Sequence, residues 1–411
     1  MSNPKKIVLA YSGGLDTSVI LPWLKERYPG VKLVAFAADL GQGDELTGLK
    51  KKALASGADE VVVADLRQEF AEQFCFKMLK AGAVYENDYL LGTSIARPLI
   101  AREQVAVAHR TGADAVGHGA TGKGNDQVRF ELTYMALDPS LTIVAPWKDP
   151  AFTLRSREAA LEYAKAKGVP VPTTRKKIYS RDRNLWHISH EGADLENPAN
   201  EPKDDLWVMS APVSKAPSKP QYVTIDFRRG VPTALNGRPM PGHQIIMKLN
   251  EIAGKHAVGQ TDLAENRLVG IKSRGAYETP GGTVLHVAHR ALESITLDRE
   301  TAHFKQQVAL KYAELVYYGQ WFTTIREAID AFVDRTQRCV TGRVKVKLFK
   351  GRATAAGVTS PKTLYDPGLA SFTMGGLYNE ADAIGFIRLF GLPMKVEALL
   401  RGRTAPRRFR R

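Results

Sequence analysis

Small polar residues and glycines crowd one short stretch near the start of the chain, Ala-Tyr-Ser-Gly-Gly-Leu-Asp-Thr-Ser at residues 10–18. The apolar run Ile7-Val8-Leu9 precedes it and apolar residues at helical spacing follow it, which predicts a strand, a tight loop and a helix. Backbone N–H groups at the start of a helix can bind an anion, and glycines let a ligand approach the backbone closely. The hydroxyls of Ser12, Thr17 and Ser18 add donors. We therefore interpret residues 10–18 as a phosphate-binding loop rather than an ordinary serine-capped turn.

A second polar, glycine-rich loop, His-Gly-Ala-Thr-Gly-Lys-Gly-Asn, covers residues 118–125. It matches most of the P-loop pattern Gly-x4-Gly-Lys, but Gly124 stands where a P-loop requires a magnesium-binding Ser or Thr. Because its three glycines make the loop costly to order without a ligand, we expect it to present four polar side chains to one: Thr121, Lys123, Asn125 and Asp126. Arg129 follows at a predicted helix start and has the planar fork that binds carboxylates.

Tyr89 and Ser94 belong to another polar cluster, residues 83–98, which precedes a long helical pattern. Ser94 is suited to cap that helix. It is equally suited, with Tyr89, to present a hydroxyl to a small polar substrate, and the sequence alone leaves both interpretations open.

Two further polar segments lie in the second half of the chain. Residues 180–205 are rich in turn-forming residues, and residues 265–282 combine an acid, bases and a tyrosine on a glycine-rich path that fits either a pocket wall or a salt-bridged loop. The pairs His187-x-x-His190 and His286-x-x-His289 have metal-like spacing but no third ligand nearby, so we interpret both as structural.

The elements that would position these residues alternate along the first 170 residues. Strands are expected at 6–10, 33–38, 60–64, 115–117 and 142–145, and helices at 17–27, 45–56, 66–81, 95–111, 127–137 and 155–167. This alternation predicts an α/β fold with a parallel, doubly wound sheet and helices on both faces. Ligands bind such sheets at the carboxyl ends of the strands, near the point where the strand order reverses. The loops at 10–18, 39–43 and 118–125 follow three such ends.

The alternation stops at a proline-rich connector, residues 168–172, which predicts a domain boundary. Beyond it, the patterns predict two antiparallel hairpins and three helices: hairpins at 222–237 and 342–358, and helices at 241–254, 281–297 and 300–318. Residues 381–403 predict a terminal helix interrupted near Gly391. An amphipathic helix outside the core favours an oligomer.

The composition bounds the class of protein. The chain has 411 residues, 44% of them hydrophobic, and a net charge of +15, of which six charges come from arginines in the tail at 401–411. This charge suits acidic ligands, and a basic tail is weak support for a nucleic-acid partner. No apolar run approaches the roughly 20 residues that span a bilayer. The two cysteines, Cys75 and Cys339, lie far apart, which fits a reducing cytoplasm.

Together these motifs resemble the argininosuccinate synthase family. The loop at 10–18 is similar to the pyrophosphate-binding PP-loop of the N-type ATP pyrophosphatases, which cleave ATP between the α- and β-phosphates. More specific are five other segments: 91–98, 118–130, 265–267, 273–280 and 312–317. The similarity runs from about residue 6 to about residue 390 and leaves mainly the arginine tail outside.

The resemblance implies an adenine nucleotide α-hydrolase-like ATP-pyrophosphatase domain at 1–170 and an α+β synthetase domain for substrate binding and multimerisation at 171–375. A C-terminal oligomerisation helix and the basic tail would occupy 376–411, and the family is described as a homotetramer. The implied reaction condenses L-citrulline with L-aspartate while ATP is converted to AMP and pyrophosphate through a citrullyl-adenylate.

The resemblance also assigns ligands to residues of this sequence. ATP would contact Ala10, Tyr11, Ser12, Gly13, Gly14, Leu15, Asp16, Thr17, Ser18, Ala38 and Gly119. Citrulline would contact Tyr89, Ser94, Asn125, Arg129, Ser180, Ser189, Glu265 and Tyr277. Aspartate would contact Thr121, Asn125 and Asp126.

Chemistry of this kind needs positioning and charge neutralisation, with Mg²⁺ on the ATP phosphates. The position of the ion is not evident from the sequence. The general base is likewise unassigned, with Asp16 and Asp126 as candidates. One departure is His190, where the family more commonly has tyrosine; it either tunes the surroundings of Ser189 or points outward.

Two rival functions fit part of the pattern. An enzyme that adenylates a tRNA base is favoured slightly by the positive charge, but a cysteine pair and an RNA-binding module are not visible. A non-catalytic nucleotide-binding module would need only the first domain. The polar clusters at 180–190 and 265–278 disfavour that interpretation.

Overall fold

The computed structural model describes residues 3–122, 124–170, 179–371 and 379–404. The chain divides into two compact units, Met1–Lys362 and Thr363–Arg411. The expected connector at 168–172 runs into residues 171–178, which lie outside the described residues, as does Lys123. The division into domains at 1–170, 171–375 and 376–411 therefore stays a prediction.

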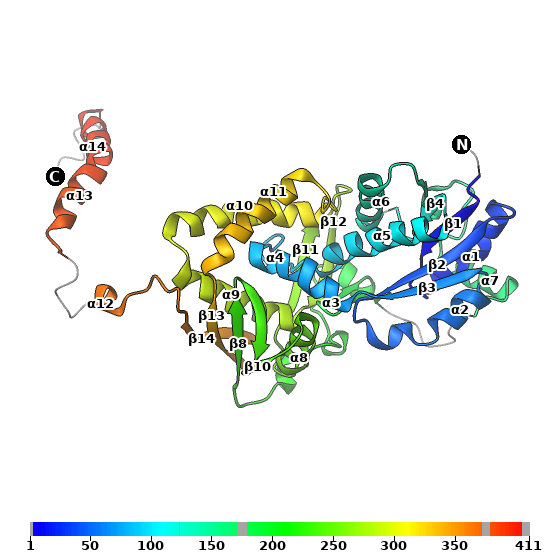
Figure 1. The fold of residues 1–411 in the computed structure, drawn as a ribbon, viewed down its shortest axis with the longest axis horizontal. Coiled ribbons are helices and arrows are strands. Elements are labelled where there is room, and N and C mark those ends of the chain that lie inside the picture. Colours follow the sequence, from blue (N-terminus) through cyan, green and yellow to red (C-terminus); the bar gives the residue numbers. More distant parts are fainter. Residues whose placement is uncertain (1–2, 123, 171–178, 372–378, 405–411) are drawn as a thin grey trace. The chain divides into compact units, whose positions relative to one another are not determined.

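The first sheet is parallel, as predicted, with strand order β3-β2-β1-β4-β5. Its strands are β1 (Lys6–Ala10), β2 (Lys32–Asp39), β3 (Glu60–Asp65), β4 (Ala115–Gly117) and β5 (Thr142–Val144). The chain runs outward from β1 to β3 on one side and returns through β4 on the other, so the strand order reverses at β1. The carboxyl ends of β1, β2 and β4 consequently meet at one edge (Figure 1).

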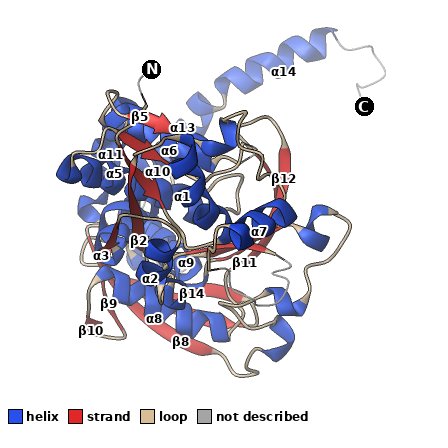
Figure 2. Ribbon diagram, turned by 90° about the vertical axis from the view of Figure 1, so that its right-hand side faces the viewer, coloured by secondary structure: helices blue, strands red, loops and turns tan. Residues whose placement is uncertain are grey.

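Both faces of this sheet are buried beneath helices (Figures 1 and 2). Ile7 and Leu9 of β1 pack into the cluster that includes helices α1 (Leu15–Arg27), α2 (Leu49–Ala55) and α7 (Arg157–Ala166). Val8, between them, packs on the opposite face in the cluster that includes α5 (Gly92–Thr111) and α6 (Asp126–Leu137). Alternating side chains that are apolar on both sides are what a doubly covered parallel strand requires.

A buried amide ties the two central strands together. Gln104 on α5 donates from Nε2 to the carbonyl oxygens of Val8 (2.6 Å) and Gly117 (2.7 Å), and Tyr134 donates to its Oε1 (2.6 Å). All of these groups are buried, so the side-chain oxygen and nitrogen are both satisfied without water. Gln104 therefore links helix α5 to β1 and β4, the paired strands that lead into the loops at 10–18 and 118–125.

Two predicted helices are interrupted in the structure. The segment expected as a helix at 45–56 begins as a 3₁₀ turn, η1 (Gly43–Leu46), and continues as α2 only after Gly48, whose φ of +72° breaks the helical path. The segment expected at 66–81 contains α3 (Arg67–Glu69), the π-helical turn η2 (Phe70–Cys75) and α4 (Phe76–Ala81).

The second half of the first unit contains the two predicted hairpins, which join into one antiparallel sheet of order β10-β9-β8-β13-β14. Its strands are β8 (Gln221–Arg228), β9 (Val231–Leu235), β10 (Arg238–Pro239), β13 (Gly342–Phe349) and β14 (Arg352–Thr359). The helices here are α8 (Gly242–Lys255), α9 (Pro280–Thr296), α10 (Arg299–Tyr317) and α11 (Thr324–Thr336). The first three confirm the prediction, whereas α11 was not expected.

A third sheet, of order β11-β12-β7-β6, was also not expected. It is formed by β6 (Ser180–Arg183), β7 (Ile188–Glu191), β11 (Gln260–Asn266) and β12 (Lys272–Glu278). Charged and polar residues along these strands were interpreted as loop residues. The strands carry them because one face of the sheet lines a cavity and needs no apolar side chains there. Short 3₁₀ turns complete this unit: η3 (Pro146–Lys148), η4 (Ala193–Glu196), η5 (Asp204–Leu206), η6 (Val213–Lys215) and η7 (Gln337–Cys339).

The second unit contains α12 (Pro367–Ala370), α13 (Asp382–Phe390) and α14 (Leu392–Thr404), with Gly391 at the predicted interruption. Helix α13 exposes large apolar side chains: Phe386 is 63% exposed and Phe390 is 73% exposed, and their rings stack on each other. Across the described part of the chain, no helix is both long and apolar enough to cross a membrane.

Candidate active site

The loop at 10–18 leaves β1 at the carboxyl edge of the parallel sheet. Gly13 has a φ of +74°, a left-handed conformation that favours glycine. Helix α1 begins directly after Gly14, and no side chain caps its first backbone N–H groups. The loop is instead fixed by hydrogen bonds between its own hydroxyls, one between Tyr11 and Ser18 (3.0 Å) and one between Ser12 and Thr17 (3.1 Å). The uncapped N–H groups remain available to an anion.

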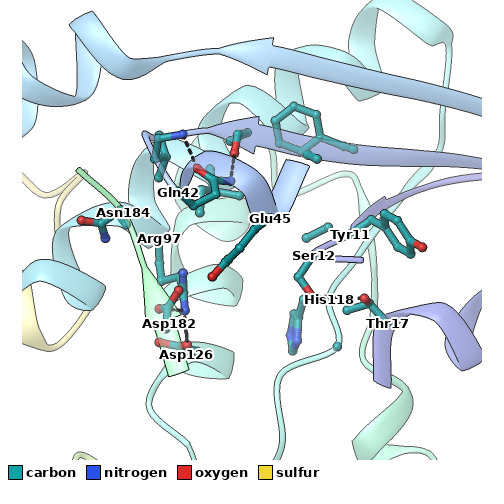
Figure 3. Close-up of a pocket in the computed structure, with 18 of the residues that line it drawn as sticks. Tyr11, Ser12, Thr17, Gln42, Glu45, Arg97, His118, Asp126, Asp182 and Asn184 are labelled. Atoms are coloured by element: carbon teal, nitrogen blue, oxygen red, sulfur yellow. Dashed lines mark hydrogen bonds and ion pairs between the residues drawn. The ribbon is translucent and has the colours of Figure 1, made fainter. Parts of the chain in front are cut away.

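A cavity of about 250 Å³ lies beside this loop, and we call it the nucleotide pocket. Its walls combine apolar side chains with polar and charged ones: Phe36, Leu40, Leu49, Ile100 and Phe130, with Gln42, Arg97, His118, Asp126, Asp182 and Asn184. In Figure 3, Arg97, Asp126 and Asp182 lie across the pocket from Ser12, Thr17 and His118. One end is suited to a flat apolar group and the other to phosphates.

The residues predicted to bind ATP fall into two sets. Those that line the nucleotide pocket are Ala10, Tyr11, Ser12, Thr17, Ala38 and Gly119. Five others are not among the residues that line it: Gly13, Gly14, Leu15, Asp16 and Ser18. Asp16 is exposed, and the Ser18 hydroxyl is buried against Tyr11.

A second cavity, of about 280 Å³, is strongly charged, and we call it the amino-acid pocket. It brings together nine of the predicted substrate residues: Tyr89, Thr121, Asn125, Asp126, Arg129, Ser180, Ser189, Glu265 and Tyr277. Sequence reasoning assigned no substrate-binding role to five other polar or charged side chains that line it: Thr93, Arg97, Asp182, Glu191 and Arg267. Ser94 is fully buried and is not among the described lining residues.

Asn125 and Arg129, at the start of α6, are held by distant parts of the chain. Asn125 donates to the Tyr317 hydroxyl (2.9 Å) and accepts from the backbone N–H of Leu268 (2.9 Å). Arg129 is 4% exposed and donates from Nε to the carbonyl oxygen of Tyr317 (3.0 Å). Tyr317 stacks on Tyr85 with ring centroids 3.8 Å apart. The end of α10 thus positions the residues that begin α6.

Glu265 and Tyr277 face each other across the hairpin of β11 and β12. Tyr277 donates to Oε1 of Glu265 (2.8 Å), whereas the buried Oε2 has no hydrogen-bond partner among the described residues. Burial raises the pKa of Glu265, although hydrogen bonds from tyrosines and the charge of Arg129 oppose the shift. A buried acceptor without a donor is costly to the free protein, so this oxygen fits a ligand N–H group.

His187 supports the other side of the same pocket. Its Nε2 lies 2.9 Å from the hydroxyl of Thr93, and its ring lies nearly parallel to that of Tyr277, with centroids 6.0 Å apart. Burial lowers the pKa of His187 to about 3, so the ring is neutral at neutral pH. A methyl group at Gly92 would lie 2.1 Å from Cγ of this ring. Only glycine at position 92 leaves room for it.

The two pockets share part of their walls. Five residues line both of them: Arg97, Gly119, Ala120, Asp126 and Asp182. Arg97 donates to Oδ2 of Asp126 from Nε (3.0 Å) and Nη2 (2.8 Å), and also pairs with Asp182 (Figure 3). Arg129 donates to the other oxygen of Asp126 (2.9 Å). A ligand in one pocket can therefore meet a ligand in the other at this shared wall.

The electrostatics of Asp126 bear on its predicted roles. Burial alone would raise its pKa, but the charges and hydrogen bonds of Arg97 and Arg129 outweigh burial and hold the pKa at about 2. A carboxylate with so low a pKa is a weak base. This disfavours the general-base role considered for Asp126 and leaves a role in binding.

His190 does not point outward and does not face the amino-acid pocket. It is fully buried, accepts from Nε of Arg181 (3.0 Å) and contacts Glu278 through Nε2 (2.8 Å). Glu278 also accepts from the backbone N–H groups of residues 208–210. Because His190 and Ser189 are neighbours on β7, they lie on opposite faces of the sheet, which explains how this position departs from the family pattern without altering the pocket.

Comparison with known proteins decides the family. The family model "Arginosuccinate synthase N-terminal HUP domain" matches residues 6–170, and the model "Arginosuccinate synthase C-terminal domain" matches residues 179–397. The chain belongs to the argininosuccinate synthase family. The match to both models confirms the family predicted from the motifs and the α/β class of the fold.

Curated relatives from several organisms agree with this argininosuccinate synthase assignment. The protein named argininosuccinate synthase from Carboxydothermus hydrogenoformans is 60% identical over 395 residues, which cover 96% of this chain and 98% of that protein. The one from a Roseiflexus species is 57% identical over 399 residues, covering 97% and 98%. Among solved structures, a U34-tRNA thiolase from Methanococcus maripaludis covers 43% of this chain and 61% of its own, with 14% identity and a TM-score of 0.27, too low to support an argument.

Proposed function

We propose that the nucleotide pocket binds ATP and that the amino-acid pocket binds citrulline and aspartate. The chain is an argininosuccinate synthase, an ATP-dependent ligase of arginine biosynthesis. It condenses L-citrulline with L-aspartate, and ATP is converted to AMP and pyrophosphate. The residue assignments that follow are our proposal.

The observation that carries the proposal is the shared wall between the two pockets. The reaction requires the ureido oxygen of citrulline to meet the α-phosphorus of ATP, and two separate pockets would not allow this. Gly119 and Ala120 border both cavities, and so do the charged side chains of Arg97, Asp126 and Asp182. Both substrates would be held in fixed positions at this wall. Their translational and rotational entropy is then lost on binding rather than on reaching the transition state, which lowers the barrier to reaction.

For ATP, the phosphates fit the loop at 10–18 and the adenine fits the apolar end of the pocket. The backbone N–H groups after Gly14 and the hydroxyls of Ser12 and Thr17 would hold the pyrophosphate portion. Ala38 and the apolar residues around it would contact the base. The family membership supports ATP as the substrate.

For citrulline, the acceptors and donors of the amino-acid pocket match the ends of the molecule. The unpaired Oε2 of Glu265 is suited to an N–H group of the ligand. Arg129 is suited to its carboxylate, and Tyr89, Ser180, Ser189 and Tyr277 present hydroxyls to the remaining polar atoms. Ser94 would act from beneath the pocket wall, where its buried Oγ has no hydrogen-bond partner among the described residues.

For aspartate, the proposed contacts are Thr121, Asn125 and Asp126 at the start of α6. The pKa of about 2 keeps Asp126 negatively charged at all physiological pH values, which suits the amino group of an amino acid. This placement brings the aspartate amine to the shared wall, where the adenylate would form.

The chemistry then takes two displacements. The ureido oxygen attacks the α-phosphorus, the bond from that phosphorus to the bridging oxygen breaks, and pyrophosphate leaves with the electron pair. The aspartate amine then attacks the ureido carbon, loses a proton and displaces AMP. Mg²⁺ would neutralise the departing pyrophosphate. The described residues contain no group of three carboxylate, histidine or cysteine ligands, which fits an ion that arrives on the ATP phosphates.

The decisive experiment is release of pyrophosphate from ATP with citrulline and aspartate added singly and together. Release that depends on citrulline, followed by AMP and argininosuccinate when aspartate is added, is the expected result. Release with aspartate alone, or none with both amino acids, would contradict the proposed occupancy of the pockets. A tRNA base in place of citrulline should not promote release.

We also propose a homotetramer in the cytoplasm. Support for association is the exposed apolar face of α13, which includes Phe386 and Phe390. Support for a reducing compartment is the pair of free cysteines, Cys75 and Cys339. Sedimentation analysis of the protein and of Phe386→Glu/Phe390→Glu tests the first point: the double variant should form smaller species, and an unchanged mass would contradict it.

A further inference from the structure

Arg97 lies at the wall that the two pockets share, and among the described residues it is the one lysine or arginine that lines both. Its side chain is 14% exposed and lines both cavities. Its Nε and Nη2 groups are engaged by Asp126 and Asp182. No described residue accepts a hydrogen bond from its Nη1 group, and this group is not among the buried polar atoms that lack a partner. The guanidinium is therefore fixed on one edge and retains two N–H donors on the other.

The transfer of AMP places its largest demand for positive charge at this shared wall. The loop at 10–18 is suited to the pyrophosphate portion of ATP, and the citrulline residues surround the amino-acid pocket. The α-phosphate must then lie between them, beside the residues that line both cavities. Negative charge on its non-bridging oxygens must be stabilised as the ureido oxygen approaches, and a cation held in advance does this without reorganisation.

We propose that Arg97 is a catalytic residue for the transfer of AMP to citrulline, a role that rests on the proposed function of the two pockets. Its Nη1 group donates to a non-bridging oxygen of the α-phosphate while the ureido oxygen forms its bond to phosphorus and pyrophosphate leaves. Arg97 stays protonated throughout and exchanges no proton. Asp126 and Asp182 are positioning residues that orient the guanidinium from behind.

Another arginine on the same helix shows what a purely structural pair looks like. Arg102 presents Nη1 and Nη2 to the two oxygens of Glu69, at 2.6 and 2.8 Å, and lines neither pocket. Both terminal nitrogens of its guanidinium are thus paired within the protein. Arg97 differs because two carboxylates from separate elements, α6 and β6, engage only one side of it. That arrangement fixes orientation and leaves donors for a ligand.

The test isolates the first displacement. Citrulline-dependent exchange of radiolabelled pyrophosphate into ATP, measured without aspartate, reports formation of the adenylate alone. Arg97→Ala should lower the maximal exchange rate by about 1,000-fold, the lower end for a transition-state arginine, while the KM for citrulline changes less than about threefold. Guanidinium ion added to Arg97→Ala should restore part of the rate. Arg102→Ala, the matched control, should stay within about twofold of wild type and show no rescue.

Two additional variants protect the test against misfolding. Arg97→Lys retains the charge and loses the fork, so its exchange rate should fall between those of wild type and Arg97→Ala. Asp182→Asn keeps Arg97 but weakens its orientation and should lower the rate by about tenfold, with KM for citrulline unchanged. If Arg97→Ala lost only condensation with aspartate and retained pyrophosphate exchange, or if only KM changed, the proposal would be wrong. Failure of wild type to exchange would refute the proposed function instead.

Discussion

The two pockets are built in different ways. The nucleotide pocket depends on a loop of nine consecutive residues, 10–18, in which one strand, one left-handed glycine and one helix follow each other directly and bring Ser12 and Thr17 to the cavity. The amino-acid pocket depends on side chains from α5, α6, β6, β7, β11 and β12, supported from behind by α10. On the proposed assignment, phosphate recognition is local and largely a property of the backbone, whereas amino-acid recognition is assembled from distant segments and resides in individual side chains.

This contrast implies different tolerance to substitution. A backbone site offers several equivalent N–H donors, so the remaining donors still bind the anion when one neighbouring hydroxyl is removed. In the amino-acid pocket each charged group would contact one particular atom of the ligand. Loss of either partner leaves a buried group without a hydrogen bond. Four variants and conditions test this difference, beginning with the largest expected effect.

Glu265→Gln should impair the amino-acid pocket and leave the nucleotide pocket unaffected. The substitution replaces the unpaired carboxylate oxygen by a neutral amide, so a charged hydrogen bond to the substrate is lost, and kcat/KM for citrulline should fall by about 10- to 100-fold. ATP binding, measured by calorimetry, should be unchanged. The matched control is Asp262→Asn on the same strand, whose partner is Arg274. An equal loss of ATP affinity in Glu265→Gln would remove the distinction between the pockets.

Gly92→Ala tests whether the amino-acid pocket depends on packing behind its walls. The added methyl group would meet the ring of His187 at 2.1 Å, so the free energy of unfolding should fall by about 1 to 3 kcal/mol and KM for citrulline should rise. Chemical denaturation and steady-state kinetics measure both. Gly385→Ala, at a helical glycine with nothing within 4 Å, should not lower the free energy of unfolding and should leave KM for citrulline unchanged. A Gly92→Ala protein as stable as wild type would show that the contact is not constraining.

Acid should weaken citrulline recognition before it affects ATP. Because the pKa of Glu265 is raised by burial, the carboxylate takes up a proton at a higher pH than the ordinary value of about 4.3. As pH falls toward that raised pKa, the charged acceptor is lost and kcat/KM for citrulline should decrease; above it the effect should vanish. The ratio of kcat/KM for citrulline between wild type and Glu265→Gln should therefore shrink as the pH is lowered from neutrality toward that raised pKa, and a ratio that stays constant in acid would contradict the assignment.

Ser12→Ala should have the smallest effect. One hydroxyl is lost from a loop whose backbone donors remain, so KM for ATP should rise by only about 2- to 10-fold. Initial rates at saturating citrulline and aspartate measure this. Ser140→Ala, on a surface turn where the hydroxyl bonds only Asp138, serves as the control. A loss above about 100-fold would show that side chains, not the backbone, dominate phosphate recognition.

The same contrast explains which features were predictable from the sequence. The loop at 10–18 could be identified because the strand, glycines and helix are adjacent in the chain. The sheet of β6, β7, β11 and β12 could not, because its polar side chains carry no alternating apolar pattern. Tyr277 opposes Ser189 only through pairing of strands that lie more than 80 residues apart in the chain.

Arg97 and Asp182 show a second limit. Both residues lie in polar segments of the sequence, but neither has a spacing to its neighbours that distinguishes it from a surface charge. Their significance arises when α5, α6 and β6 meet at one wall. The resemblance to a family supplied the substrate residues, and only the folded chain shows which cations lie between the substrates.

Gln104 has a consequence for redesign of this scaffold. One amide group bonds the carbonyl oxygens of Val8 and Gly117, on the two paired strands that lead into both substrate loops. The separation of these strands is that of a hydrogen-bonded ladder and does not vary. Libraries that seek new acceptors of the adenylyl group should therefore vary the loops above this base and leave residue 104 unchanged.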